Sequence, residues 1–205
     1  RQKPVVKTDI TGRYIAYLSN TKVIASQAGI AGDLYIFDTQ LGQNVLESGS
    51  KKSIFIGKNI SGDFEFFPDG KSVVFIEENG NLCVSDFKNK KLLDSNVSGI
   101  YHNSQGKVLY SKKSQIRSPE NNKALSDIYL CIIGKKTTIL SMGQGVYDVI
   151  DYTEDFSKVL FTSLGKEVIL GQPSKNVVVC DTSKKENRVL ATGVSSVIDG
   201  SAFYE

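Results

Sequence analysis

Short apolar runs recur along this chain at a nearly constant spacing. The runs are rich in β-branched and aromatic residues, and they end at the matching positions Asp38, Asp86, Ile132 and Asp181. Successive end positions are 48, 46 and 49 residues apart. A repeat of this length that is filled with short strands is typical of the blades of a β-propeller.

Each repeat divides into four short apolar runs separated by turn residues, which predicts four antiparallel strands. In the first repeat the predicted strands are 5–10, 14–19, 34–38 and 44–48. The repeats cover about 5–49, 62–96, 99–142 and 146–193, and residues 194–205 begin a further strand or blade. We therefore expect an all-β fold, a β-propeller with about four four-stranded antiparallel blades, in one domain over residues 1–205. The blades either close by themselves or form part of a larger propeller.

The turn between the first two strands of the second repeat carries the most specific motif. Phe66-Phe67-Pro68-Asp69-Gly70-Lys71 is a proline-initiated tight turn with glycine where a positive φ is easiest. Together with the closing aspartates, it resembles the blade signature of the TolB-like and dipeptidyl-peptidase-IV-like (WD-repeat-like) propellers, from which Ile132 departs. The resemblance implies a relation to periplasmic or cell-surface binding modules and to the non-catalytic domain of serine peptidases.

Composition excludes several classes of protein. The 205 residues are 40% hydrophobic and 23% charged, which is typical of a globular domain, and no apolar run is long enough to span a membrane as a helix. A net charge of +3 is too small to indicate nucleic-acid binding. Because the sequence begins at Arg1 without a leader, we expect it to be processed or excised from a longer chain. Its lysine, asparagine and isoleucine content favours a bacterial extracytoplasmic protein.

The three cysteines, Cys83, Cys131 and Cys180, fall inside predicted strands of different repeats. Their odd number argues against a disulfide framework, and no C-x-x-C pair indicates a metal site. We expect them to be buried thiols that pack as small hydrophobic side chains.

Candidate chemistry is sparse. The chain has no G-x-S-x-G motif, the acidic run 148–155 lacks the spacing of a calcium loop, and Gly143-Gln144-Gly145 is interpreted as a linker between blades. The single histidine, His102, lies on the innermost predicted strand of the third repeat, where it either faces the central channel as a ligand or proton carrier or has only a structural role. We expect no catalytic site, no metal and no cofactor.

Three long connections, at 20–33, 112–127 and 163–176, are predicted on one face of the propeller. They contain apolar residues that a fully solvated loop does not need, so they either recognise a partner or fold back onto their own blades. With His102, the candidate binding residues are Ile24, Ile30, Ile116, Arg117, Leu125, Ile169 and Leu170.

Lysines gather in the turns that join the last two strands of the blades, on the opposite face. This basic face consists of Lys88, Lys90, Lys91, Lys135, Lys136, Lys184 and Lys185. It would attract an anionic polymer or an acidic membrane leaflet, unless these are ordinary turn lysines that prevent edge pairing.

These features favour a non-catalytic β-propeller domain that recognises a protein or a surface polymer through its long-loop face. One alternative is a substrate-filtering propeller portion of a larger hydrolase or peptidase. Another is an electrostatic anchor that uses the basic face.

Overall fold

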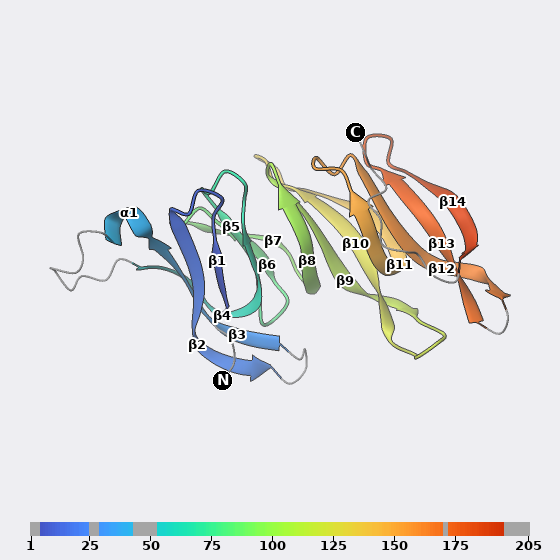
Figure 1. The fold of residues 1–205 in the computed structure, drawn as a ribbon, viewed down its shortest axis with the longest axis horizontal. Helices are drawn as coiled ribbons and strands as arrows, with labels where there is room; N and C mark the ends of the chain where they lie inside the picture. Colours follow the sequence, from blue (N-terminus) through green and yellow to red (C-terminus); the bar gives the residue numbers. More distant parts are fainter. Residues whose placement is uncertain (1–4, 25–28, 43–52, 170–171, 195–205) are drawn as a thin grey trace. The chain divides into compact units, whose positions relative to one another are not determined.

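The computed structural model describes residues 5–24, 29–42, 53–169 and 172–194 (Figure 1). Apart from the short helix α1 (Thr39–Gly42), the regular structure of these residues is β-strand, which confirms the all-β prediction. The strands form two seven-stranded antiparallel sheets, ordered β1 to β7 and β8 to β14. Contacts between Cα atoms divide the chain into unit 1, residues 1–105, and unit 2, residues 106–205. The strands are β1 (Val6–Thr8), β2 (Tyr14–Ile24), β3 (Gly29–Asp38), β4 (Ser53–Phe66), β5 (Val73–Glu77), β6 (Leu82–Ser85), β7 (Lys90–Asp94), β8 (Val97–Ser104), β9 (Lys107–Arg117), β10 (Ala124–Ile132), β11 (Thr138–Tyr152), β12 (Lys158–Ile169), β13 (Gln172–Asp181) and β14 (Glu186–Val194).

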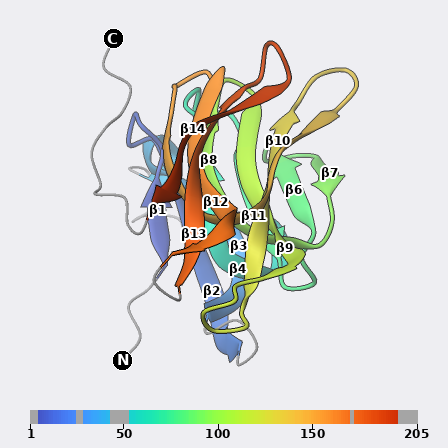
Figure 2. The ribbon, with the colours of Figure 1, turned by 90° about the vertical axis from the view of Figure 1, so that its right-hand side faces the viewer.

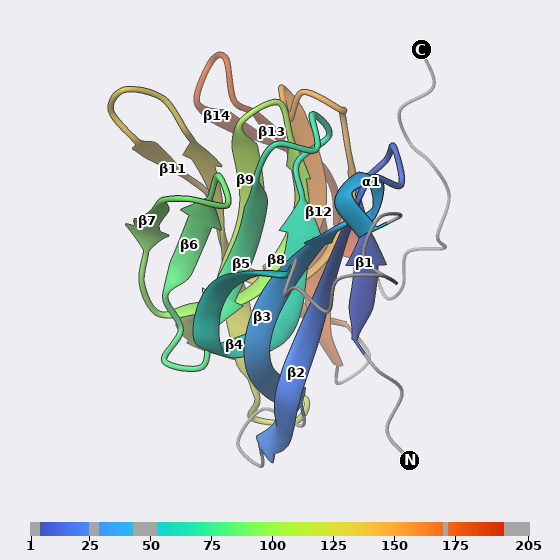
Figure 3. The same ribbon diagram turned by 90° about the vertical axis from the view of Figure 1, so that its left-hand side faces the viewer.

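Strand β4 is shared between two sets of strands in unit 1. Its residues 53–61 pair with β3, whereas residues 60–66 pair with β5. The exchange of partners falls where Asn59 has a positive φ of 53° and Gly62 carries no side chain, so the strand can turn there without breaking. We call β1, β2, β3 and residues 53–61 the first strand set, and residues 60–66, β5, β6 and β7 the second strand set. Figure 3 shows β2, β3, β4 and β5 side by side in this order.

The continuous β4 corrects the sequence prediction at this point. The predicted repeats leave residues 49–62 as a crossover connection between the first two blades, but residues 53–62 belong to β4, in which residues 53–61 pair with β3 and Ile60 also pairs with β5. The predicted strand 44–48 lies outside the described residues.

Strand β11 has the same construction in unit 2. It pairs with β10 up to Val146 and with β12 from Val146 onwards. The predicted linker Gly143-Gln144-Gly145 is therefore not a loop; it lies inside β11, next to the exchange of partners, and Gly145 has a φ of +59°. We call residues 146–152, β12, β13 and β14 the final strand set (Figure 2).

The three connections predicted to be long are largely strand. Ladder pairing continues to Ile24–Gly29 in the β2–β3 hairpin, to Arg117–Ala124 in the β9–β10 hairpin and to Ile169–Gln172 in the β12–β13 hairpin. The continued pairing explains why these connections contain apolar residues. In a paired hairpin, an apolar side chain can pack against its cross-strand neighbour. The prediction of long loops at these three positions was wrong.

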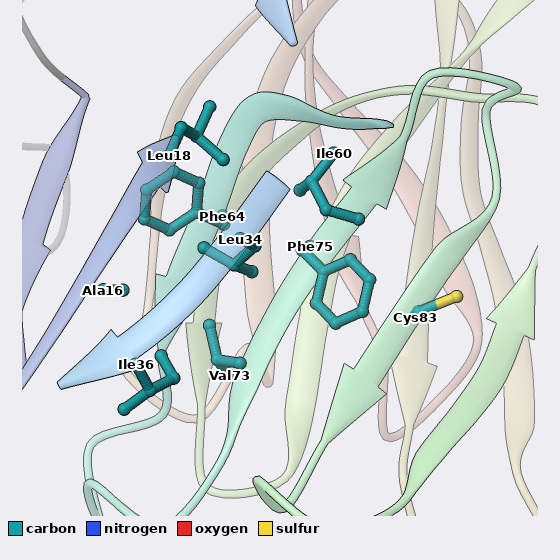
Figure 4. Packing of buried hydrophobic residues seen from close by; sticks show 9 residues of the cluster. All are labelled: Ala16, Leu18, Leu34, Ile36, Ile60, Phe64, Val73, Phe75 and Cys83. Carbon is teal, nitrogen blue, oxygen red and sulfur yellow. The ribbon is translucent and has the colours of Figure 1, made fainter. Parts of the chain in front are cut away.

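The core of unit 1 is formed by two rows of side chains that face each other (Figure 4). Alternation along the strands of the first set turns one side chain in two towards this core. The second set contributes larger side chains, including two phenylalanines, so that small residues lie opposite large ones. The cluster consists of Ala16, Leu18, Leu34, Ile36, Ile60, Phe64, Val73, Phe75 and Cys83.

We predict that Leu34→Ala lowers the free energy of unfolding by about 2–5 kcal/mol, because Leu34 is fully buried and truncation leaves a cavity. Leu92→Ala, the same truncation at a strand position that is mostly exposed, should cost less than about 0.5 kcal/mol. Urea unfolding of the full chain, followed by circular dichroism, measures both. Equal losses in the two variants would contradict the assignment of this core.

Candidate functional site

The aspartates that close the repeats act as caps of the turns that follow them. The Asp86 carboxylate accepts the backbone N–H groups of Lys88 and Asn89 at 3.0 and 2.6 Å. The Asp181 carboxylate accepts the N–H and hydroxyl groups of Ser183 at 3.0 and 2.6 Å. These hydrogen bonds, from the Asn89 backbone and from the Ser183 hydroxyl first of all, lower the pKa of both aspartates. The repeated aspartate is therefore explained by turn geometry, without a ligand.

A threonine after the closing aspartate ties two turns together in the first and last repeats. The Thr39 hydroxyl donates to the carbonyl of Arg13 at 2.9 Å, and the Thr182 hydroxyl donates to that of Phe156 at 3.0 Å. In the second repeat the same position is Phe87, which has no hydroxyl. This repeat has therefore replaced a turn-to-turn hydrogen bond by an aromatic ring.

Phe87 is held in an unusual conformation. Its φ of 71° lies in the left-handed region, which a bulky residue rarely adopts and which costs energy. Its ring packs against Tyr14 at a centroid distance of 5.0 Å and against Phe66 at 6.3 Å. Sequence reasoning missed Tyr14 and Phe87; the signal that could have found them is the change from Asp-Thr to Asp-Phe at the repeat's closing position.

Beside the Tyr14–Phe87 ring pair, unit 1 has an open hollow of about 320 Å³. One wall is aromatic and aliphatic, and the rim carries two lysines and two aspartates. The lining residues are Tyr14, Asp38, Ile54, Lys71, Asp86, Phe87 and Lys88. We call this the turn-side hollow.

The charges around the turn-side hollow are not all balanced. Asp38 is nearly buried and pairs with Arg13, whose Nη2 lies 3.0 Å from Asp38 Oδ2. That hydrogen bond raises the pKa of Arg13. The Lys71 and Lys88 ammonium groups form no ion pair with any residue that the structure describes. The hollow therefore combines an apolar wall with two available cations, which suits an anionic ligand that has an apolar part.

The candidate binding residues of the three hairpins lie in different surroundings. The side chains of Ile24, Ile169 and Leu170 are outside the described part of the structure. Ile30 is half-buried, Leu125 is buried, and His102 is half-buried on β8.

Ile116 and Arg117 are the candidates that are exposed at a described hairpin end. A Cβ on Gly145 would lie 2.9 Å from Ile116 Cδ1, so the glycine makes room for this side chain on β11. The Arg117 guanidinium donates to the carbonyl of Asn122 at 2.8 Å and so braces its own turn.

The seven lysines of the basic face are all exposed, in or next to the turns that join β6 to β7, β10 to β11 and β13 to β14. Lys90 is neutralised, because its Nζ lies 2.7 Å from Glu77 Oε1, an interaction that raises the pKa of Lys90. Lys88 is the member of this set that also lines the turn-side hollow.

The three cysteines are buried, as predicted, and none of them forms a disulfide with a described residue. Burial raises the pKa of Cys83 to about 11 and raises that of Cys180, so neither thiol is activated as a nucleophile. Within the described ranges, no three histidine, cysteine, aspartate or glutamate side chains gather closely enough to hold a metal ion. Nor does any helix there have the length and apolar character of a membrane span.

No family model matches the sequence, and no curated protein matches it. Solved structures do match. Dipeptidyl peptidase 4 from Porphyromonas gingivalis aligns over 93% of this chain with a TM-score of 0.54 and 13% identity, and acylaminoacyl peptidase from Pyrococcus horikoshii over 95% with 0.52 and 14%. The chain spans 32% and 33% of the lengths of these two proteins. The fold is propeller-like. At this identity the likeness concerns the fold alone, and it confirms a dipeptidyl-peptidase-4-like propeller fold.

Acid should weaken the turn that Asp155 caps. Hydrogen bonds from the Ser157 backbone, the Ser157 hydroxyl and the Thr153 hydroxyl hold the pKa of Asp155 at about 2, below the ordinary 3.8. Because the folded pKa is lowered, the stabilisation is present above about pH 4 and is lost as the pH falls towards about 2.

We therefore predict that Asp155→Asn lowers the urea midpoint at about pH 5 and shows a smaller further drop at about pH 2.5 than the wild type. The control is Glu154→Gln, since Glu154 accepts no hydrogen bond from the described residues. An acid response in Asp155→Asn that equals those of the wild type and the control would refute the capping role.

Proposed function

We propose that this chain is a non-catalytic β-propeller module whose role is to bind another molecule. In this interpretation the strand sets are four-stranded blades, about four of them, alone or within a larger propeller. The sharing of β4 and β11 supports this count, because each of these strands serves as the outer strand of one set and the inner strand of the next. The three thiols are buried, and the closing aspartates Asp86 and Asp181 accept hydrogen bonds from turn backbones. We therefore favour binding over catalysis as the role of this chain.

The observation that carries the proposal is the turn-side hollow. Its apolar wall holds Tyr14 and Phe87, and its rim holds Lys71 and Lys88 without ion-pair partners among the described residues. A segment that presents carboxylates next to an aromatic or aliphatic group fits both features. Because the lysines are exposed, their attraction is screened by salt, so the affinity should fall as ionic strength rises.

The hairpin ends are a second binding surface for a protein or a surface polymer. Ile116 and Arg117 are exposed there, at the end of a paired strand that holds them in a defined position. The remaining lysines of the basic face, in this proposal, add a weaker attraction to anionic polymers or membrane surfaces.

A second candidate function follows from the matched structures. Both aligned proteins are peptidases, and this chain corresponds to about a third of each. We propose as the alternative that the chain is the propeller portion of a larger hydrolase, in which it filters or holds substrate for a catalytic part. Under either function, we propose that the chain is located outside the bacterial cytoplasm, as expected for a TolB-like protein.

The turn-side hollow can be tested with two labelled decapeptides, one of alternating glutamate and tyrosine and one of alternating lysine and tyrosine. We predict that the acidic peptide binds and the basic one does not. The double variant Lys71→Glu/Lys88→Glu should weaken binding at least about tenfold, because it reverses both rim charges. Fluorescence anisotropy at low and high salt provides the dissociation constants.

The matched control is Lys184→Glu/Lys185→Glu, which makes the same charge change in another turn. Equal weakening by the two double variants would show that net charge alone governs binding, and the hollow would be rejected. Release of nitroaniline from dipeptidyl nitroanilides by the chain alone, abolished by His102→Ala, would instead reject the non-catalytic assignment.

A further inference from the structure

Strand β4 contacts β8, and near this contact it carries two carboxylates beside a buried amide. Asp63 and Glu65 lie on the same side of β4, because they flank Phe64 in a strand whose successive side chains alternate. The Asn103 Nδ2 group of β8 donates to Glu65 Oε2 at 2.9 Å. Asp63 is exposed, Glu65 is half-buried, and Asn103 is only 3% exposed. We call Asp63, Glu65 and Asn103 the β4–β8 cluster.

The Asn103 side chain has one acceptor that no described residue uses. Its Oδ1 atom is buried and accepts no hydrogen bond from the described part of the chain. The orientation of this carboxamide follows from its neighbour, because exchanging its nitrogen and oxygen would place an oxygen against the Glu65 carboxylate. Oδ1 is bonded to the same carbon as Nδ2, so it lies beside that carboxylate. A buried acceptor without a partner costs free energy, which a cation at this position would recover.

The negative charge of the β4–β8 cluster is only partly compensated. Although Asp63 reaches solvent, the protein around it reduces its hydration, and this raises its pKa; Lys7 lowers the pKa, and Glu65 raises it further. Lys7 Nζ lies 3.6 Å from Glu65 Oε1, beyond the usual range of an N–H···O hydrogen bond. The same ammonium lies 5.7 Å from the centroid of the Phe64 ring, a contact that it can keep without Glu65. When both carboxylates are ionised, two negative charges therefore face the single positive charge of Lys7.

A second glutamate of unit 1 has the same types of neighbour, but its ion pair is closed. Glu77 Oε2 accepts a hydrogen bond from Asn81 Nδ2 at 3.0 Å, and Lys90 Nζ donates to Glu77 Oε1 at 2.7 Å. Burial raises the pKa of Glu77, but the hydrogen bonds from Lys90 and Asn81 outweigh this effect and lower the pKa. Glu77 thus has its cation within the protein, whereas Lys7 makes no direct hydrogen bond to Glu65.

We propose that the β4–β8 cluster binds a hard divalent cation, Ca²⁺. The donors are the carboxylates of Asp63 and Glu65 and the Oδ1 atom of Asn103, and water completes the coordination. Carboxylate and amide oxygens are the ligands that Ca²⁺ takes in proteins, and Ca²⁺ tolerates irregular geometry better than Mg²⁺ does. The absence of nitrogen and sulfur donors from this set disfavours Zn²⁺ and softer metals.

This site differs from the groups of three histidine, cysteine, aspartate or glutamate side chains considered above, because its third donor is an amide. The sequence predicted no metal, and the donors are indeed not close along the chain, since Asn103 lies 38 residues from Glu65. Two carboxylates make a weak site, and the charge of Lys7 weakens it further. We therefore expect a dissociation constant of roughly 0.1–1 mM, which is the range of extracellular calcium-binding modules.

Isothermal titration calorimetry of the 205-residue protein with CaCl₂ tests the proposal. Glu65→Gln should weaken Ca²⁺ binding at least about tenfold, because it removes one donor charge while its amide oxygen can still accept the hydrogen bond from Asn103. Lys7→Met should strengthen binding about threefold or more, because it removes a positive charge that repels the ion. A carboxylate cluster with only a structural role would not give this increase.

Glu77→Gln is the matched control, because it makes the same change at the glutamate whose ion pair is closed, and it should bind Ca²⁺ as the wild type does. Circular dichroism verifies that each variant folds, and Asp63→Asn, at an exposed position, replaces Glu65→Gln if the latter does not fold. The proposal is overturned if the wild type binds no Ca²⁺ up to about 10 mM, or if it binds Mg²⁺ as tightly as Ca²⁺. Equal weakening by Glu77→Gln, or weaker binding by Lys7→Met, also overturns it. The turn-side hollow shares no residue with this cluster, so peptide binding there is an independent result.

Discussion

The packing of one strand set's aliphatic side against the next set's aromatic row is the interaction on which unit 1 depends. Leu34 and Ile36 can cover Phe75 only while every strand keeps its register, because a slip of one residue would turn both rows outward. The sharing of β4 limits such slips, since its ladder with β3 and its ladder with β5 meet at Ile60. Hydrophobic burial and strand pairing therefore stabilise the same arrangement.

The turns follow from that packing. Strands that end together leave backbone N–H groups without ladder partners, and short polar side chains next to each turn bind them. Asp86, Asp181 and Asp155 do this with carboxylates, while Thr39 and Thr182 link neighbouring turns through their hydroxyls. Residues that look like a functional signature in the sequence thus serve the scaffold. Function is better sought where a repeat departs from this pattern, as the second repeat does at Phe87.

The likeness to two peptidases fits a scaffold of this kind. The propeller-like fold is shared at 13% and 14% identity, so the common property is the stacking of twisted strand sets, and side chains on the turns and edges are free to differ. In this chain the distinctive surfaces are the turn-side hollow and the exposed hairpin end at Ile116 and Arg117.

The sequence alone determined most of the strands, the spacing of the repeats, the positions of the tight turns and the burial of the three thiols. These depend on local chemistry: alternation with a period of two, the short side chains that bind turn backbones, and cysteines inside apolar runs. Only the tertiary structure decided that β4 and β11 run through expected connections and that the long connections are paired hairpins. It also decided that Tyr14 and Phe87 meet. Each of these depends on which strand lies alongside, and that is set by burial between segments far apart in the chain.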